Sequence, residues 1–172
     1  MQFQIQFHYY NNDIKYYDLM FESDKDIRST LMIGGGGYSY PKHFISNNTD
    51  KYMDIVEIDG QVTDIAKKYF YLDTLIDEFD LNETKRLNLI TEDGRVYINK
   101  NQKKYDAILN DAFSGHIPVA TLTTYESIKL IKNSLNEGGL YLSNIISSLE
   151  GGWSKFIRAE VNTLQKLFKF VY

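Results

Sequence analysis

An apolar run, Leu31 to Ile33, leads directly into four consecutive glycines, Gly34 to Gly37. Glycines after a buried strand let the backbone approach a ligand closely, because no side chain intervenes. A second apolar run, Met53 to Val56, ends in Glu57 and Asp59, roughly 20 residues beyond the loop. A glycine loop followed at this distance by a strand-end carboxylate is typical of a nucleotide-type cofactor site, where the acid accepts hydrogen bonds from ribose hydroxyls.

The spacing of the glycines narrows the class of ligand. NAD-binding loops favour G-x-G-x-x-G, but counting from Gly34 the third position of that pattern falls on Ser39. A phosphate-binding P-loop ends in G-K-S/T, which is absent from this loop. The loop therefore suits a nucleoside without a pyrophosphate, with Glu57 as the candidate ribose acceptor. The alternative is a tight strand-to-helix turn that binds nothing.

Composition excludes several other classes of protein. At 172 residues the chain has the size of one domain, and its net charge of −4 argues against nucleic acid as the main partner. It has no cysteine, which excludes disulfides and thiolate chemistry, and its histidines have no partners at metal-site spacing, so no metal is expected. No apolar run approaches the roughly 20 residues that span a bilayer, and no signal peptide opens the chain. We therefore expect a cytoplasmic protein with no membrane partner.

Short apolar runs alternate with helical patterns along the whole chain. Near-continuous apolar strands separated by helices indicate a doubly wound, mostly parallel, Rossmann-like α/β sheet with helices on both faces. The acidic stretch 73–80 is expected to be a solvated connector or a short surface helix. Strands are predicted at 2–7, 30–33, 53–58, 87–91, 105–110 and 140–146, with 170–172 as a candidate start of one more. Helices are predicted at 14–22, 38–46, 61–70, 123–135 and 153–168.

Two of these helices carry more detailed predictions. In the helix at 61–70, an apolar face is expected from Val62, Ile65, Ala66 and Tyr69. For the helix at 123–135, Thr123 followed by Glu126 three residues later has the pattern of a capping box, with Thr123 as the N-cap.

Two further strand ends carry polar residues. Asp93 and Gly94 follow the predicted strand 87–91, where a carboxylate can accept from the exocyclic amine of adenine while a backbone amide meets a ring nitrogen. An Asp-Gly pair is also a common turn. Asp111 follows the strand 105–110 and could act as a general base or hold a cationic nucleophile; the alternative is a cap for the next loop. His116 is more typical of a solvated loop residue, and the absence of G-x-S-x-G disfavours a serine hydrolase.

Taken in order, five segments resemble one family, the spermidine synthases, which are aminopropyltransferases on the class I methyltransferase fold. The resemblance extends from about Ile27 to Ile146. Its segments are MIGGGGYSYPKH, VEIDGQVTDIAKKYF, ITEDGRVYI, YDAILNDAFSGHIP and GGLYLSNI. The family holds decarboxylated S-adenosylmethionine with its glycine loop, its strand-end acid and its Asp-Gly pair. The resemblance therefore implies Asp111 as the catalytic residue, and as cofactor-binding residues Gly34, Gly35, Gly36, Glu57, Asp93 and Gly94.

The chain departs from the family pattern at two acidic positions. Gly37 stands where the family has an aspartate that meets the amino group of the aminopropyl arm, and Ser114 stands where a second aspartate helps to hold the polyamine ammonium. Removing one partner of a buried charge pair typically costs about 2–5 kcal/mol, so diamine affinity should fall by orders of magnitude. Without an acid at position 37, nothing repels the carboxylate of intact S-adenosylmethionine, which becomes as good a candidate ligand as the decarboxylated form.

The family's N-terminal β-hairpin domain is represented here only by residues 1–26, which we expect to form a short strand and helix before a nucleoside-binding α/β domain at 27–172. The fold is therefore expected to be truncated at both ends. The leading hypothesis is a transferase that moves an aminopropyl group to an amine or polyamine, with methyl transfer equally open and a homo-oligomer, expected to be a dimer, as the assembly. The alternatives are a binding protein that kept the nucleoside pocket without turnover and, more weakly, a nicotinamide-dependent oxidoreductase.

Overall fold

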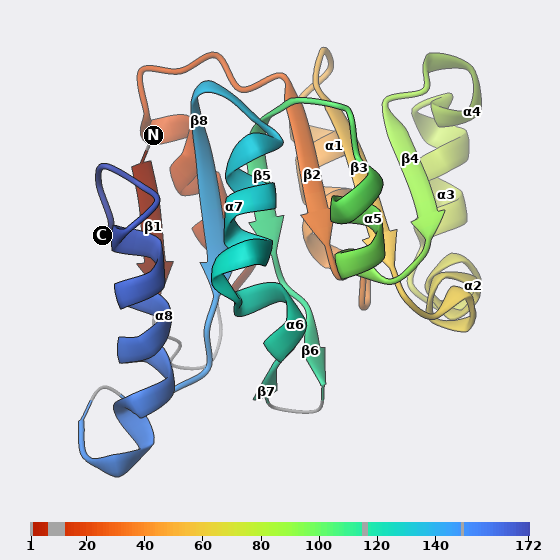
Figure 1. The fold of residues 1–172 in the computed structure, drawn as a ribbon. Helices are drawn as coiled ribbons and strands as arrows, with labels where there is room; N and C mark the ends of the chain where they lie inside the picture. Colours follow the sequence, from red (N-terminus) through yellow and green to blue (C-terminus); the bar gives the residue numbers. More distant parts are fainter. Residues whose placement is uncertain (1, 7–12, 115–116, 149) are drawn as a thin grey trace.

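The computed structural model describes residues 2–6, 13–114, 117–148 and 150–172. Its main feature is a sheet of six strands in the order β1–β8–β5–β2–β3–β4, in which every neighbouring pair is parallel (Figure 1). The predicted fold class is therefore confirmed. The strands are β1 (Gln2–Gln6), β2 (Ser29–Ile33), β3 (Tyr52–Glu57), β4 (Leu87–Thr91), β5 (Tyr105–Asn110) and β8 (Leu135–Asn144).

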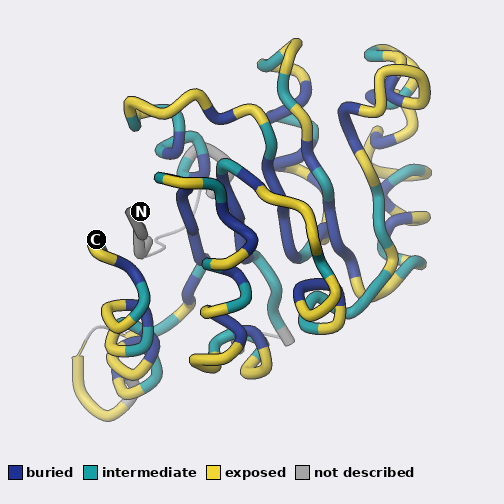
Figure 2. The backbone as a smooth tube through the Cα atoms, turned by 45° about the horizontal axis from the view of Figure 1, so that its top comes forward, coloured by how far each residue is buried: buried dark blue, intermediate teal, exposed yellow. Residues whose placement is uncertain are grey.

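Helices cover both faces of this sheet. On one face lie η1 (Asp13–Glu22), α1 (Ser39–Asn47), α2 (Gly60–Tyr69), α3 (Leu72–Glu78) and α4 (Leu81–Thr84). On the other lie α5 (Gly94–Lys100), α6 (Ala120–Thr123), α7 (Tyr125–Asn133) and α8 (Lys155–Gln165). Figure 2 shows the result as buried strands between helices whose outer sides are exposed. A short antiparallel pair, β6 (Phe113–Ser114) and β7 (Ile117–Pro118), follows β5, and a 3-10 turn, η2 (Gly152–Ser154), precedes α8.

Register brings three loops to one edge of the sheet. In the central strand β2, Ile33 pairs with Val56 of β3 on one side and with Asn110 of β5 on the other. The next residue of each strand therefore emerges at the same level, because parallel strands end at a common edge. The backbone bonds continue past the strands: Gly34 N donates to Val56 O at 2.8 Å, and Asp111 N donates to Ile33 O at 2.8 Å.

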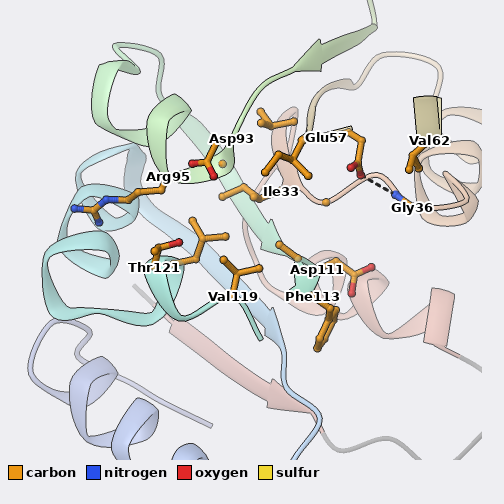
Figure 3. Close-up of a pocket in the computed structure, with 16 residues that line it drawn as sticks. Ile33, Gly36, Glu57, Val62, Asp93, Arg95, Asp111, Phe113, Val119 and Thr121 are labelled. Carbon is orange, nitrogen blue, oxygen red and sulfur yellow. Dashed lines mark hydrogen bonds between the residues drawn. The ribbon is translucent and has the colours of Figure 1, made fainter. Parts of the chain in front are cut away.

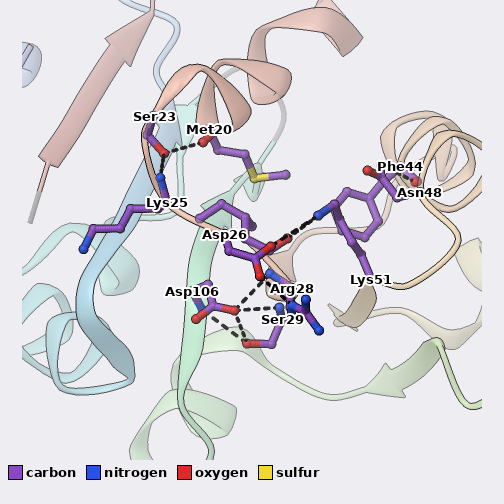
Figure 4. Close-up of polar contacts among 11 residues, drawn as sticks. Met20, Ser23, Lys25, Asp26, Arg28, Ser29, Phe44, Asn48, Lys51 and Asp106 are labelled. Carbon is purple, nitrogen blue, oxygen red and sulfur yellow. Dashed lines mark hydrogen bonds and ion pairs between the residues drawn. The ribbon is translucent and has the colours of Figure 1, made fainter.

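The opposite, amino-terminal edge is tied together by one carboxylate (Figure 4). Asp106 Oδ2 accepts from the backbone amides of Arg28 (3.0 Å) and Ser29 (2.9 Å) and from the Ser29 hydroxyl (3.0 Å). Its other oxygen accepts from Asn136 Nδ2 at 2.7 Å. Burial acts to raise the pKa of Asp106, but these hydrogen bonds outweigh it and hold the pKa below its usual value. This network fixes β2 against β5 and β8.

The predicted apolar face of α2 is confirmed at Ala66 but is wrong at Ile65 and Tyr69. The helix turns Thr63 and Ala66 toward the core, while Ile65 and Tyr69 are 48% and 61% exposed. Apolar spacing missed this orientation because the buried position belongs to a polar residue: Thr63 Oγ1 lies 2.7 Å from the buried Tyr38 hydroxyl. A hydrogen-bonded threonine can be buried at little cost.

Boundaries near the C-terminal half also differ from prediction. Thr124, not Thr123, caps α7, since its Oγ1 accepts from Ser127 N at 3.2 Å. Thr123 instead ends α6, a helix that the sequence did not indicate. Strand β8 begins at Leu135, so that Gly138 and Gly139 lie inside it rather than before it. Residues 170–172 form no strand, and the edge of β8 pairs with β1 instead.

Candidate functional site

A cavity of about 370 Å³ lies at the carboxyl edge of the sheet. The loops after β2, β3 and β5 form one side of it, and the start of α5 and helix α6 form another. Figure 3 shows its two ends: Glu57, Gly36 and Asp111 lie at one, and Asp93, Arg95 and Thr121 lie at the other. The cavity brings together nearly all of the predicted site residues: Gly34, Gly36, Glu57, Asp93, Gly94 and Asp111.

The Glu57 carboxylate is already oriented by the glycine loop. Its Oε2 accepts from Gly35 N at 2.8 Å and from Gly36 N at 3.1 Å, and its Oε1 accepts from Asp59 N at 3.1 Å. Glu57 is only 8% exposed, so these charge-assisted bonds hold it in one position. Gly35 does not itself line the cavity, so its role in the site is to hold the Glu57 carboxylate through its backbone amide. A carboxylate has about four acceptor sites, so Oε1, which accepts one bond here, keeps a site for a ribose hydroxyl.

Two glycines are required by close approaches rather than by a ligand. Gly34 has a φ of +97°, and a Cβ atom there would lie 2.6 Å from Asp111 O. A Cβ atom at Gly94 would lie 2.5 Å from Ile33 Cγ2. These contacts pack the loop after β5 and the first turn of α5 against the end of β2. Gly36, with a φ of +49° and open space where its Cβ would be, is the glycine that leaves room in the cavity.

Asp93 has a structural role in addition to its place in the cavity. It is the N-cap of α5, and its Oδ1 accepts from Val96 N at 2.9 Å. Its Oδ2 has no hydrogen-bond partner among the described residues and is free for a ligand. The sequence placed Asp93 in the site but did not predict the helix that it caps.

Asp111 is held by a residue that sequence analysis missed. Asn144, the last residue of β8, donates from Nδ2 to Asp111 Oδ1 at 2.8 Å. Tyr17 of η1 lies close on the other side: burial, and after it the Asp111 carboxylate, raise the pKa of Tyr17 well above its ordinary value. Asn144 carried no clear signal, because the predicted strand 140–146 runs past it and its pairing with the strand at 105–110 is a tertiary contact. Tyr17 likewise carried no signal among 14 tyrosines.

Apolar side chains form the walls between the two polar ends. Ile58 is 67% exposed although it is large and apolar, and it lines the cavity together with Val62 of α2. On other sides the walls are Ile33, Val56, Ala112, Val119 and Leu122. An apolar slot with a few convergent polar groups is the usual form of a small-molecule site.

Two of the residues singled out in the sequence cannot be placed in the site. His116 lies outside the described residues, as does the side chain of Ser114. Across the described ranges, no group of three histidine, aspartate or glutamate side chains is arranged to hold a metal ion. Within those ranges too, none of the helices combines the length and the apolar character needed to cross a bilayer.

This chain is similar to one protein family in sequence and to several solved structures in fold. Residues 8–168 match the family model described as Spermine/spermidine synthase domain. The polyamine aminopropyltransferase of Vibrio vulnificus is 35% identical over 145 residues, which cover 83% of this chain and 44% of that protein. A probable spermidine synthase from Corynebacterium glutamicum superposes with a TM-score of 0.72 at 20% identity, over 88% of this chain and 52% of the other. Human methyltransferase-like protein 13, solved with SAH, gives a TM-score of 0.67 at 20% identity, over 90% of this chain and 68% of that chain.

The structural likenesses, at 20% identity, establish the fold as a Rossmann-like sheet of the methyltransferase type. The chain spans about half the length of the curated relatives that it matches. The activity and substrates of a whole relative therefore do not pass directly to this chain and require their own argument.

Proposed function

Because this chain belongs to the spermine/spermidine synthase family, we propose that it binds an adenosyl-sulfonium donor and transfers the donor's aminopropyl group to an amine. The observation that carries the proposal is the arrangement of Glu57, Asp93 and Asp111. Glu57 ends β3, and Asp93 and Asp111 follow β4 and β5, yet all three line one cavity beside the glycine loop. The ligand is S-adenosylmethionine or its decarboxylated form, of which only the decarboxylated form carries an aminopropyl group to transfer, and the acceptor is an amine or polyamine.

The cavity suggests how the donor lies. The ribose diol donates to the Glu57 carboxylate, which the Gly35 and Gly36 amides already hold in place. The adenine occupies the apolar slot, with its exocyclic amine donating to Asp93. This orientation directs the sulfonium and its arm toward Asp111, at the end of the cavity nearest the glycine loop.

The reaction is a displacement at carbon. The lone pair of the acceptor nitrogen attacks the propyl carbon bonded to the sulfonium, the carbon–sulfur bond breaks, and its electron pair neutralises the sulfur to give methylthioadenosine. The attacking nitrogen becomes cationic and loses its proton to the Asp111 carboxylate, which passes it to solvent. Since the sulfonium is already a good leaving group, most of the catalysis is alignment of nitrogen, carbon and sulfur. Asn144 supports this by fixing one oxygen of Asp111.

Methyl transfer from S-adenosylmethionine is the second candidate, and the site favours it at one position. A Cβ atom at Gly37 would have only Ser39 Oγ nearby, at 3.8 Å, so this chain has neither charge nor bulk at the position where the family resemblance puts the end of the donor arm. An intact methionine carboxylate is tolerated there as well as a bare aminopropyl arm. The same attack on the methyl carbon would release S-adenosylhomocysteine instead of methylthioadenosine.

Calorimetry and product analysis test the proposal together. We expect methylthioadenosine to bind the purified chain, and we expect one of the two donors to yield its own product when amines are supplied. Asp111→Asn should keep donor affinity within about twofold and abolish turnover, because it removes the proton acceptor and leaves the ribose and base contacts intact. Binding without turnover on any amine would identify a non-catalytic nucleoside-binding protein. Failure to bind any adenosyl compound would overturn the proposal.

Three further features belong to the proposal. We infer a homo-oligomer, with a dimer as the expected state, which light scattering after size-exclusion chromatography tests. We infer a cytoplasmic location, which cell fractionation tests. The division at residue 27 also stays a prediction; β1 adds to the edge of the main sheet, so expression of residues 27–172 alone measures whether that part folds without it.

A further inference from the structure

Tyr38 has a left-handed backbone conformation, which is energetically unfavourable for a bulky residue. Four non-glycine residues in the described part of the chain have a positive φ, and Tyr38 is the one that is fully buried, with a φ of 54°. A bulky side chain in this region is rare and persists where the surroundings hold it there. The contacts of Tyr38 therefore need an explanation.

Those contacts connect the glycine loop to helix α2. Tyr38 N donates to Gly35 O at 2.8 Å, which closes a tight turn. The Tyr38 ring lies directly against Gly35, since a Cβ atom at that glycine would be 2.6 Å from Tyr38 Cζ. The Tyr38 hydroxyl lies 2.7 Å from Thr63 Oγ1, with which it shares a hydrogen bond. The Tyr38 side chain thus connects the glycine loop to the buried face of α2.

The Tyr38 side chain packs against the part of the loop whose amides hold Glu57. Gly35 N and Gly36 N donate to one oxygen of that carboxylate. Burial raises the pKa of Tyr38, and the nearby Glu57 carboxylate also raises it, so the phenol stays neutral beside the acid. Any shift of the ring would move Gly35, and with it the two amides.

We propose that Tyr38 is a positioning residue for donor binding. Its hydroxyl bond to Thr63 fixes the ring, the ring sets the position of the Gly35 and Gly36 amides, and the amides aim the Glu57 carboxylate at the ribose. The last step of this chain rests on the proposed function; the earlier steps concern the protein alone. Tyr38 touches neither the donor nor the reacting atoms in this scheme.

Amide hydrogen exchange tests the ligand-independent steps. In the full chain without ligand, Tyr38→Phe and Thr63→Val each remove one side of the shared bond with little change in volume. We expect both variants to increase exchange of the Gly35 and Gly36 amides about three- to tenfold, the range expected for loss of one hydrogen bond. The Gly34 amide, bonded to Val56 O, should exchange at the wild-type rate and is the internal reference. Unchanged exchange at Gly35 and Gly36 in both variants would overturn the proposal.

Calorimetry with methylthioadenosine tests the final step. We expect each variant to bind about tenfold more weakly, and the double variant to bind no more weakly than either, because both act through one bond. Tyr105→Phe is the matched control: it removes another buried hydroxyl, 2.7 Å from Tyr97 Oη, at the amino end of β5. It should lower stability and leave affinity unchanged. Additive losses, or an equal loss in the control, would reduce Tyr38 to a purely structural residue. If the wild type does not bind methylthioadenosine, the proposed function fails, and the exchange data still decide the role of Tyr38.

Discussion

Asn144 and Asp111 meet across two parallel strands: the Asn144 amide, at the end of β8, donates to Asp111 Oδ1 at 2.8 Å, at the end of β5. Asp111 also lies beside Tyr17 of η1, whose pKa its carboxylate raises. Asn144 therefore fixes the position of the carboxylate that the proposed reaction uses as its proton acceptor.

Replacing Asn144 should therefore reduce turnover more than binding. For Asn144→Leu we expect kcat to fall about tenfold, while donor affinity stays within about twofold, because the ribose and base contacts are elsewhere. Asn144→Asp should be worse, since a second carboxylate raises the pKa of Asp111 and moves the pH–rate profile to higher pH. Steady-state kinetics beside calorimetry measure both effects. Equal losses in kcat and in affinity would mean that Asn144 only supports the fold.

Neutralising Glu57 should weaken donor binding. Glu57→Gln keeps the shape of the side chain but removes its charge: if the remaining oxygen accepts from the two loop amides, the new NH2 group faces Asp59 N and cannot accept from it or from a ribose hydroxyl. Hydrogen bonds to charged groups contribute about 1.5–3 kcal/mol, so we expect a 10- to 100-fold loss of affinity for methylthioadenosine by calorimetry. Asp59→Asn is the control: Asp59 caps α2 by accepting from Gln61 N at 2.9 Å, and its loss should change stability alone.

An acid at position 37 should change which donor is preferred. There is space for the side chain in Gly37→Asp, and its charge would attract the ammonium of an aminopropyl arm and repel the carboxylate of intact S-adenosylmethionine. We expect the ratio of the two affinities to move about tenfold toward the decarboxylated donor. Competition binding measures this ratio directly. A ratio that stays at the wild-type value would show that the donor arm does not pass Gly37.

Stability should fall as the pH rises toward neutrality. Glu160 of α8 is 3% exposed, and burial raises its pKa from 4.5 to about 7. The folded state therefore binds this proton more tightly than the unfolded chain. The contribution is fully present below about pH 4.5, decreases as the pH rises to about 7, and is then constant, with a total change of about 3 kcal/mol.

Urea unfolding across this range checks the sign and the size of that change. Glu160→Gln should remove this part of the pH dependence and should stabilise the protein above pH 7, because the amide has no charge to bury. A variant with the same pH profile as the wild type would rule out Glu160 as the source.

The part of the site that could be predicted is the part built by neighbouring strands. Gly34, Glu57 and Asp111 follow short apolar runs, and parallel pairing alone brings such positions to one edge. Residues that depend on tertiary contacts could not be placed in this way. Asn144 reaches Asp111 only because β8 pairs with β5, and no local pattern specifies that neighbour.

Predictions from local sequence patterns were wrong where a polar residue is buried or where two neighbouring residues can both cap a helix. They misplaced the inner face of α2, because the Thr63 hydroxyl has a partner in Tyr38. They chose Thr123 as a cap over Thr124, since both threonines precede the same helix and Glu126 favoured the first. They gave no sign of α5, whose seven residues are too few for a periodic pattern.

The pairing of β1 with β8 has a consequence for biosynthesis. Gln2 to Gln6 lie opposite Leu140 to Asn144, so β1 has no neighbour until β8, which pairs with it from more than 130 residues further along the chain, has been translated (Figure 1). Such distant pairings are slow to form, because the closure entropy of the intervening chain must be overcome first. The nascent protein should therefore assemble around β2, β3 and β5, and acquire its outermost strand as the last step of maturation.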